Sequence, residues 1–318
     1  MHILAVSQAL KQTLSLHEVT RAMAAGIQSA GATPLVVEGS DGGDGLLDAL
    51  AERLRAQKEY TVPGPLGRPV TVPVGWLDPL IALIESRLVC GLDLVPMGER
   101  DPERATTRGL GELILAVERA GAQRAYVGLG GSATVDGGDG LAEAWEGCRP
   151  TLDLVGLCDV TVPLGGALRF APQKGADSAM VARLGERLSH LAAGHPDAAR
   201  MPGAGAAGGL GFGLVVHGDA TLVSGADWVL DRAGFDTALA DADLVIVTEG
   251  AFDDTSRLGK LTGTVLDRAH AAGCPAAIVA PTVTDAPAGV LVETGGGRWT
   301  AAILAERVAA LVRRVSET

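Results

Sequence analysis

The hexapeptide DGGDGL occurs twice in the sequence, at Asp41–Leu46 and at Asp136–Leu141, and each copy precedes a stretch typical of a helix. Its glycines allow backbone N–H groups to approach an anion, and a helix N-terminus adds a partial positive charge. The aspartates would repel a bare phosphate, but they suit a site in which a hard cation such as Mg²⁺ lies between carboxylates and phosphate. The functional interpretation is therefore a metal–phosphate site, and the structural one is a capped loop.

Four segments share one order, in which an apolar strand is followed by a glycine-rich turn and then by a helix. They are EGSDGGDGLLDAL, GLGGSATVDGGDGLAEA, MPGAGAAGGLGFGL and IVTEGAFDDTSRLGKLTG. Because open α/β sheets bind ligands outside the carboxyl ends of their strands, we expect these turns to meet in one cleft. The phosphate-binding pattern GxxxxGK[ST] does not occur, and VGLGGSA does not fit the dinucleotide-binding pattern GxGxxG.

The composition indicates a folded protein of two domains, because the 318 residues include 47% apolar and 20% charged residues. A net charge of −12 without a Lys/Arg run argues against nucleic-acid binding. No apolar window of about 18 residues could span a bilayer, and MHILAVSQAL lacks the features of a signal peptide. We therefore expect a cytoplasmic protein that binds a small molecule and neither nucleic acid nor membrane. Whether it forms a homodimer stays open.

Alternating strands and helices are expected to position the turns. The apolar segments HILAV and TPLVVEG predict strands, and helices are predicted over 17–30 and 46–57. The following segment EYTVPGPLGRPVTVPVGWLD, rich in Pro, Gly and β-branched residues, predicts antiparallel strands, with Pro63–Pro65 as a crossover into a second domain. Near the end, DADLVIVTEG and PAAIVAP predict buried parallel strands before a C-terminal amphipathic helix.

The predicted fold class is α/β, with two domains. Residues 1–62 and 236–318 are expected to form a Rossmann-like domain with a doubly wound parallel sheet. Residues 63–235 are expected to form an inserted α/β domain, with helices over 107–120 and 179–193. The segment 101–145 could belong to either domain.

Several long segments resemble the bacterial glycerate kinase family of the type I class. They are DPERATTRGLGELILAVERAGAQRAYVGLGGSATVDGGDG, CDVTVPL, FAPQKGA and PGAGAAGGLG, and the first DGGDG, IALIESRLVCGLDLVP and EGAFDDTSRLGK also fit, in the same order. The resemblance covers nearly the whole chain, with gaps. It implies a two-domain kinase that uses ATP and Mg²⁺ to phosphorylate D-glycerate or a related small hydroxy acid, with its active site between the domains.

The resemblance also implies roles for residues at the matching positions, because phosphoryl transfer depends on positioning and charge neutralisation. The implied catalytic residues are Asp41, Asp136 and Lys260. The implied substrate- or phosphate-binding residues are Lys11, Gly130, Gly131, Ser132, Thr134, Lys174, Glu249 and Asp253. The implied metal ligands are Asp44 and Asp159.

The chain departs from the family pattern at five polar positions. Where the family usually has Asp-Ser after the first strand, this chain has Gln8 and Ala9. Val135 and Val162 stand in place of asparagines, and Ala251 stands in place of an arginine. One lost charged hydrogen bond is worth ~1.5–3 kcal/mol, so the changes together predict an altered substrate or weakened catalysis.

Three functional hypotheses follow from the sequence. The first is an ATP-dependent kinase for D-glycerate or a related hydroxy acid. The second is a relative that has lost catalysis and binds a nucleotide or metabolite, which the five departures favour. The third, suggested by the GLGG turn, is a nicotinamide-dependent dehydrogenase, which would have to bind a hydride cofactor.

Overall fold

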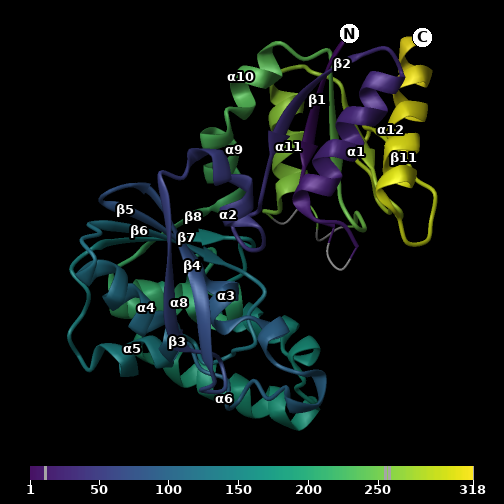
Figure 1. Cartoon of the computed structure of the whole chain (residues 1–318). Helices are drawn as coiled ribbons and strands as arrows, with labels where there is room; N and C mark the ends of the chain where they lie inside the picture. The colour runs from purple at the N-terminus through teal and green to yellow at the C-terminus, as the bar shows by residue number, and fades with distance from the viewer. Residues whose placement is uncertain (11–12, 254–255, 257–258, 318) are drawn as a thin grey trace. The chain divides into compact units, whose positions relative to one another are not determined.

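The structure is a computed structural model that describes residues 1–10, 13–253, 256 and 259–317. The chain forms two compact units, which we describe separately (Figure 1). Unit 1 comprises Met1–Asp41, Asp48–Leu50 and Ala226–Thr318, and unit 2 comprises Gly42–Leu47 and Ala51–Gly225. Among the helices described, none is both long enough and apolar enough to cross a membrane.

Unit 1 contains a five-stranded sheet whose neighbouring strands are all parallel. In spatial order the strands are β11 (Leu291–Glu293), β10 (Ala276–Val279), β9 (Leu244–Thr248), β1 (His2–Ser7) and β2 (Thr33–Glu38). The chain continues from β1 to β2 on one side, whereas β9 lies on the other side of β1 and is followed by β10. The strand order therefore reverses between β1 and β9, which is the topological switch point of the sheet.

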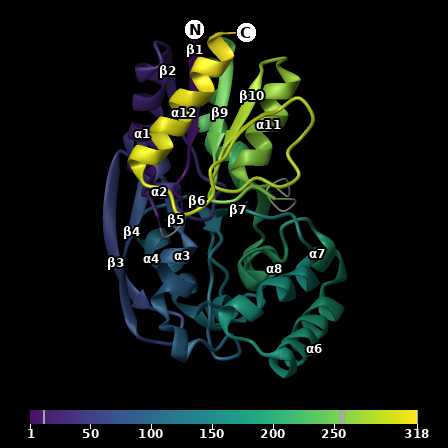
Figure 2. The same cartoon turned by 90° about the vertical axis from the view of Figure 1, so that its right-hand side faces the viewer.

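Both faces of this sheet are buried, because alternate residues of β1 enter different hydrophobic clusters. Leu4 and Val6 pack with residues from α9 (Gly225–Ala233), α10 (Phe235–Ala240) and α11 (Leu261–Ala271). Ile3 and Ala5 pack with residues from α1 (Leu16–Ser29) and α12 (Ala301–Ser316), which lie side by side (Figures 1 and 2). The predicted doubly wound parallel sheet is confirmed.

Unit 2 contains a six-stranded mixed sheet in the order β3-β4-β5-β6-β7-β8. Its antiparallel part consists of β3 (Ala56–Pro63), β4 (Pro69–Asp78) and β5 (Ile81–Glu85). From β5 onward, the sheet continues in parallel through β6 (Arg124–Leu129), β7 (Asp153–Cys158) and β8 (Thr221–Ser224). The carboxyl ends of β5, β6, β7 and β8 consequently lie at one edge of this sheet.

The helices of unit 2 lie in the segments that follow β5, β6 and β7. The α-helices are α3 (Ser86–Cys90), α4 (Arg108–Arg119), α5 (Asp139–Trp145), α6 (Ser178–Gly194), α7 (Pro196–Arg200) and α8 (Ala206–Gly218). The short helix α2 (Leu46–Ala49) follows β2, and its residues are divided between the two units. Short 3₁₀ helices span Ala51–Arg53, Leu92–Leu94, Met97–Glu99, Leu164–Phe170 and Pro172–Lys174. Positive φ values at Ala207, Gly208 and Gly209 interrupt α8 near its start, in the glycine-dense segment expected to be a loop or helix start.

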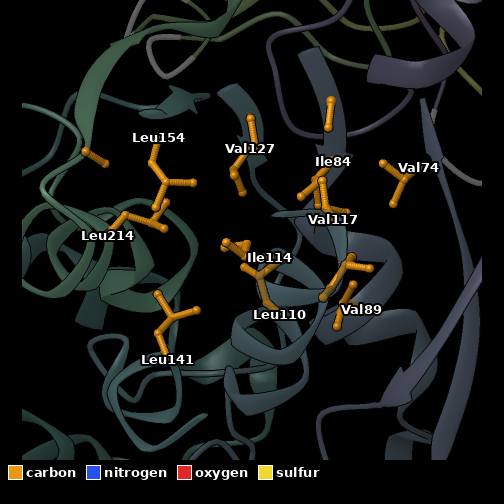
Figure 3. Packing of buried hydrophobic residues seen from close by; sticks show 14 of the residues in the cluster. Val74, Ile84, Val89, Leu110, Ile114, Val117, Val127, Leu141, Leu154 and Leu214 are labelled. Atoms are coloured by element: carbon orange, nitrogen blue, oxygen red, sulfur yellow. The ribbon is translucent and has the colours of Figure 1, made fainter. Parts of the chain in front are cut away.

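The main hydrophobic cluster of unit 2 packs one face of the sheet against helices (Figure 3). Ile84 of β5 and Val127 of β6 pack there with Leu110 and Ile114 of α4. Each such side chain contributes about 1.5–3 kcal/mol when it is fully buried. This packing fixes the strands whose carboxyl ends carry the turns.

The predicted helix over 46–57 is wrong. The structure has one short helical turn, α2, then the 3₁₀ helix Ala51–Arg53, and β3 already begins at Ala56. A Cβ at Gly75 of β4 would lie 2.8 Å from Leu54 Cδ2 and 2.9 Å from Leu47 Cδ2. These leucines therefore lie over the sheet, and pairing with β4 overrides the local helical propensity.

The expected domain boundaries also differ from the observed units. The segment Pro63–Pro65 is the start of the β3–β4 hairpin turn and not a crossover, since Gly64 N–H donates to Arg68 O at 2.7 Å. The boundary expected after residue 62 falls near residue 50 because all of β3 pairs with β4. The later boundary falls at 225/226, and the segment 101–145 belongs to unit 2.

We expect Gly26→Ala to lower the free energy of unfolding by about 1–3 kcal/mol. A Cβ at Gly26 of α1 would lie 2.4 Å from Ala305 O and 2.9 Å from Val308 Cβ of α12. The clash outweighs the gain of about 1 kcal/mol in helix propensity. Urea titration measures the difference, and Gly194→Ala, whose Cβ would meet no atom within 4 Å, is the near-neutral control. A Gly26→Ala protein as stable as the wild type would contradict this packing.

Candidate functional site

Three segments meet at the carboxyl ends of β6 and β7 in unit 2. Gly130 follows β6 and Asp159 follows β7. A Cβ at Gly130 would lie 2.8 Å from Asp159 Oδ2 and 2.8 Å from the Cα of Gly43. The first DGGDG turn, the GGSAT turn and the Asp159 carboxylate are therefore neighbours, as the strand-end argument predicts.

Arg87 of α3 connects two of these segments. Its Nη1 forms an ion pair with Asp44 Oδ1 in the first DGGDG turn, and its Nη2 forms one with Asp93 Oδ2. A Cβ at Gly131 would lie 2.9 Å from Arg87 Cδ, so the arginine side chain also contacts the GGSAT turn. Guanidinium groups bind carboxylates and phosphates, so Arg87 is a functional candidate that no motif in the sequence indicates.

Glu85, the last residue of β5, is a second functional candidate that the sequence analysis missed. Its side chain is buried, and its two oxygens accept the N–H of Gly45 at 3.1 Å and the N–H of Leu47 at 3.3 Å. Burial raises the pKa of Glu85 to about 7, although the two N–H donors lower it. The signal available in the sequence was a charged residue at the end of the apolar strand IALIE.

Lys174 is enclosed by the protein, with a residue exposure of 4%. Its Nζ donates to Ser132 Oγ at 2.9 Å and to Thr134 O at 2.8 Å. Burial lowers the pKa of Lys174 to about 8. A Cβ at Gly208 would lie 3.1 Å from this Nζ and 1.9 Å from Thr134 O, so the glycine-dense segment covers the lysine. Lys174 therefore joins the 3₁₀ helix Pro172–Lys174 to the GGSAT turn.

Asp136, in the second DGGDG turn, is 1% exposed and accepts four hydrogen bonds. Thr107 donates its N–H and its hydroxyl to Oδ2, both at 2.8 Å. Gly138 N–H donates to Oδ1 at 3.2 Å, and Gly140 N–H donates to Oδ2 at 3.3 Å. This carboxylate therefore joins the start of α4 to the start of α5.

Polar side chains of unit 1 gather at the switch point between β1 and β9. Gln8, directly after β1, donates from Nε2 to Thr248 O at 2.9 Å and to Thr262 Oγ1 at 3.0 Å. Gln8 is one of the departures from the family pattern. Its amide connects the end of β1 to β9 and α11 through these two hydrogen bonds. Thr262 is a further polar group that the sequence analysis did not single out.

Glu249 and Lys260 form an ion pair beside these residues, with 3.7 Å between Oε1 and Nζ. The Glu249 side chain is 14% exposed, and burial raises its pKa, as the nearby Asp41 charge also does. Lys260 occupies the N-cap position of α11. The predicted residues Asp41, Glu249 and Lys260 therefore belong to one electrostatic cluster in unit 1.

Two predicted site residues and four of the departures remain. Asp253 lies in a tight turn, in which its N–H donates to Ser256 Oγ at 3.2 Å. Lys11 lies outside the described residues. Of the departures, Val135 is fully buried in a hydrophobic cluster and Ala251 is exposed, while Ala9 and Val162 are half-buried.

The described residues offer two carboxylates for a metal ion at the first DGGDG turn. No group of three or more His, Cys, Asp or Glu side chains within the described ranges could hold a metal ion. Mg²⁺ usually takes one or two carboxylates and completes its shell with phosphate oxygens and water. Asp159, next to Gly130, and Asp44, which follows Gly43 in the chain, are carboxylates of this kind.

We expect Asp136→Asn to lower the free energy of unfolding by about 3 kcal/mol, because an amide would face donors that now bind a carboxylate. Urea unfolding measures the loss, and Asp139→Asn, which removes only an ion pair with the partly exposed Arg187, is the control. A variant that keeps its stability and loses only turnover would instead indicate contact with substrate.

We expect the unfolding free energy of the wild type to rise relative to Lys174→Met between about pH 8 and pH 10.5, by up to about 3 kcal/mol. The unfolded chain keeps Lys174 protonated up to its ordinary pKa of 10.5, whereas the folded chain releases the proton at about 8, so the cost of the buried charge disappears over this window. Urea titrations across the window measure the difference. Lys58→Met, at an exposed lysine over Trp76, should keep the slope of the wild type. A flat difference for Lys174→Met would contradict the buried ammonium.

Comparison with known proteins identifies the family of the chain. The profile of the Glycerate kinase family matches residues 3–150 and 145–306. The chain is 36% identical over 303 residues to the glycerate kinase of Bacillus subtilis (82% of this chain, 79% of the relative). It is 37% identical over 328 residues to the glycerate 2-kinase of Escherichia coli (90% and 86%). A crystal structure from Salmonella typhimurium LT2, of a protein provisionally named glycerate kinase 2, matches with a TM-score of 0.78 and 31% identity over 100% of this chain and 97% of that one. The chain belongs to the glycerate kinase family.

Proposed function

We propose that the protein transfers the terminal phosphoryl group of ATP, in the presence of Mg²⁺, to a hydroxyl group of D-glycerate. The observation that carries the proposal is the Lys260–Glu249 pair at the switch point of the unit 1 sheet, where open α/β sheets bind ligands. Lys260 stands at the amino end of α11, so its ammonium and the helix dipole supply positive potential at the same place. The names of the relatives from Bacillus subtilis and Escherichia coli support glycerate as the substrate.

In this proposal Lys260 neutralises charge on the transferred phosphoryl group. Glu249 or Asp41 accepts the proton of the attacking hydroxyl. Glu249 is the better acceptor because burial raises its pKa and brings it closer to neutrality. Its ion pair with Lys260 keeps the carboxylate available in its charged form.

A separate cluster in unit 2 is proposed to bind the Mg-phosphate group. The GGSAT turn, at Gly130 and Gly131, is proposed to bind phosphate oxygens through backbone N–H groups. Asp44 and Asp159 are the proposed ligands of Mg²⁺, which neutralises phosphate charge when it is bound. Lys174 and Asp136, enclosed by the protein, are proposed to hold this surface and not to touch the substrate.

We expect Lys260→Met to lower kcat by ~10²–10³-fold, the usual loss when one charge-stabilising donor is removed from a transition state. ADP release from Mg-ATP, with and without D-glycerate, measures the effect. The matched control is Lys58→Met, which removes an exposed ammonium of unit 2 and should leave kcat unchanged. A phosphorus NMR spectrum of the product distinguishes 2-phosphoglycerate from 3-phosphoglycerate.

Two outcomes would contradict the proposal. Equal kcat for Lys260→Met and the wild type would remove Lys260 from the mechanism. A wild-type protein that binds ATP without glycerate-dependent ADP release would favour the second hypothesis, a family member that binds a nucleotide without turnover.

A further inference from the structure

Glu85 is a buried charged group that the proposed chemistry does not use. It ends β5, and its residue exposure is 5%. Oε1 accepts the N–H of Gly45 and Oε2 accepts the N–H of Leu47, so both carboxylate oxygens bind the backbone of the first DGGDG turn and the start of α2. The same turn carries Asp44, a proposed ligand of Mg²⁺.

Ionisation of Glu85 destabilises the folded chain, because the carboxylate is buried. Burial raises its pKa from 4.5 to about 7, with a further increase from Asp44 and a decrease from Arg87. The unfolded chain loses this proton near pH 4.5 and the folded chain near pH 7. The contribution of Glu85 to the free energy of unfolding is therefore greatest below pH 4.5 and falls as the pH rises to about 7. Replacing the carboxylate by a neutral group of the same shape removes this cost.

The glycines of the turn place few intrinsic restrictions on its backbone. Gly42 and Gly45 have φ values of 89° and 71°, in the left-handed region that glycine adopts without strain. Glycine also has the largest backbone freedom to lose when a turn becomes ordered. Arg87 holds the Asp44 side chain, and Glu85, two residues earlier, holds the backbone on both sides of Leu46.

We propose that Glu85 is a positioning residue, whose carboxylate holds the first DGGDG turn in the arrangement that presents Asp44 to the Mg-phosphate group. The inference rests on the proposed function for its effect on turnover, but not for its effect on the turn. Glu85 acts through the N–H groups of Gly45 and Leu47 and does not touch the substrate.

Glu85→Gln tests this role, because the amide keeps the shape of the side chain and replaces one accepting oxygen by a donor. The loss of one hydrogen bond to a charged group corresponds to a factor of ~10 or more. Hydrogen–deuterium exchange of the peptide covering residues 42–47 should accelerate by at least ~10-fold, and kcat should fall by ~10-fold or more. The unfolding midpoint should stay close to that of the wild type, because the variant also removes the cost of the buried charge.

Glu293→Gln is the matched control. Glu293 is also a buried glutamate at the end of a strand, but it lies in unit 1 and pairs with Arg307 at 3.3 Å and Arg314 at 2.9 Å. This variant should lose stability, keep kcat and leave exchange in residues 42–47 unchanged. The two variants thus separate positioning of the turn from stabilisation of the fold.

Unchanged exchange of residues 42–47 in a folded Glu85→Gln protein would overturn the inference. The inference would also be wrong if exchange accelerated throughout unit 2 and the free energy of unfolding fell together with kcat. That result would indicate a purely structural role for Glu85. If the variant does not fold, hydrogen–deuterium exchange of the Gly45 and Leu47 amides in the wild type tests the two hydrogen bonds to Glu85. Exchange as fast as in an unstructured peptide would contradict both bonds. If the wild type shows no glycerate-dependent ADP release, the proposed function fails, and the exchange result still decides the role of Glu85.

Discussion

The site in unit 2 depends on a close approach of backbone to backbone at the end of β6. A Cβ at Gly128 would lie 2.2 Å from Gly42 O, and a Cβ at Gly130 would lie 2.8 Å from Gly43 Cα. Only glycine on the β6 side allows the first DGGDG turn to rest directly on the strand. This contact brings the turn close to Glu85 and Arg87. Glu85 then accepts hydrogen bonds from the backbone of the turn, and Arg87 pairs with Asp44.

The two copies of DGGDGL share one contact and differ in their surroundings. At the fourth position of each copy an aspartate pairs with an arginine, Asp44 with Arg87 of α3 and Asp139 with Arg187 of α6. At the first position of the second copy, Asp136 accepts hydrogen bonds from Thr107, Gly138 and Gly140. The first copy instead rests with Gly42 and Gly43 against the end of β6. The hexapeptide alone could not reveal these contacts, because the partners come from distant parts of the chain.

Much of the fold could be predicted from the sequence, and rather less of the site. The apolar strand β9 and the amphipathic helices α4 and α6 occur where their periodicity predicts them. The helix expected over 46–57 failed because strand pairing with β4, a long-range effect, outweighed local propensity. Glu85 and Arg87 were missed because they follow an apolar strand without a glycine-rich turn. Their importance arises from contacts with residues about 40 positions earlier in the chain.

The structure also bears on the five departures from the family pattern, which the sequence alone favoured as signs of weakened catalysis. Gln8 remains a polar group that bonds to Thr248 and Thr262 at the switch point. Val135 is buried among apolar side chains, where an amide would need partners of its own to avoid a cost. Neither change removes a charged group from the Lys260–Glu249 pair or from the Asp44–Arg87 pair. Since phosphoryl transfer depends mainly on placed charges, the presence of both pairs favours the kinase over the non-catalytic relative.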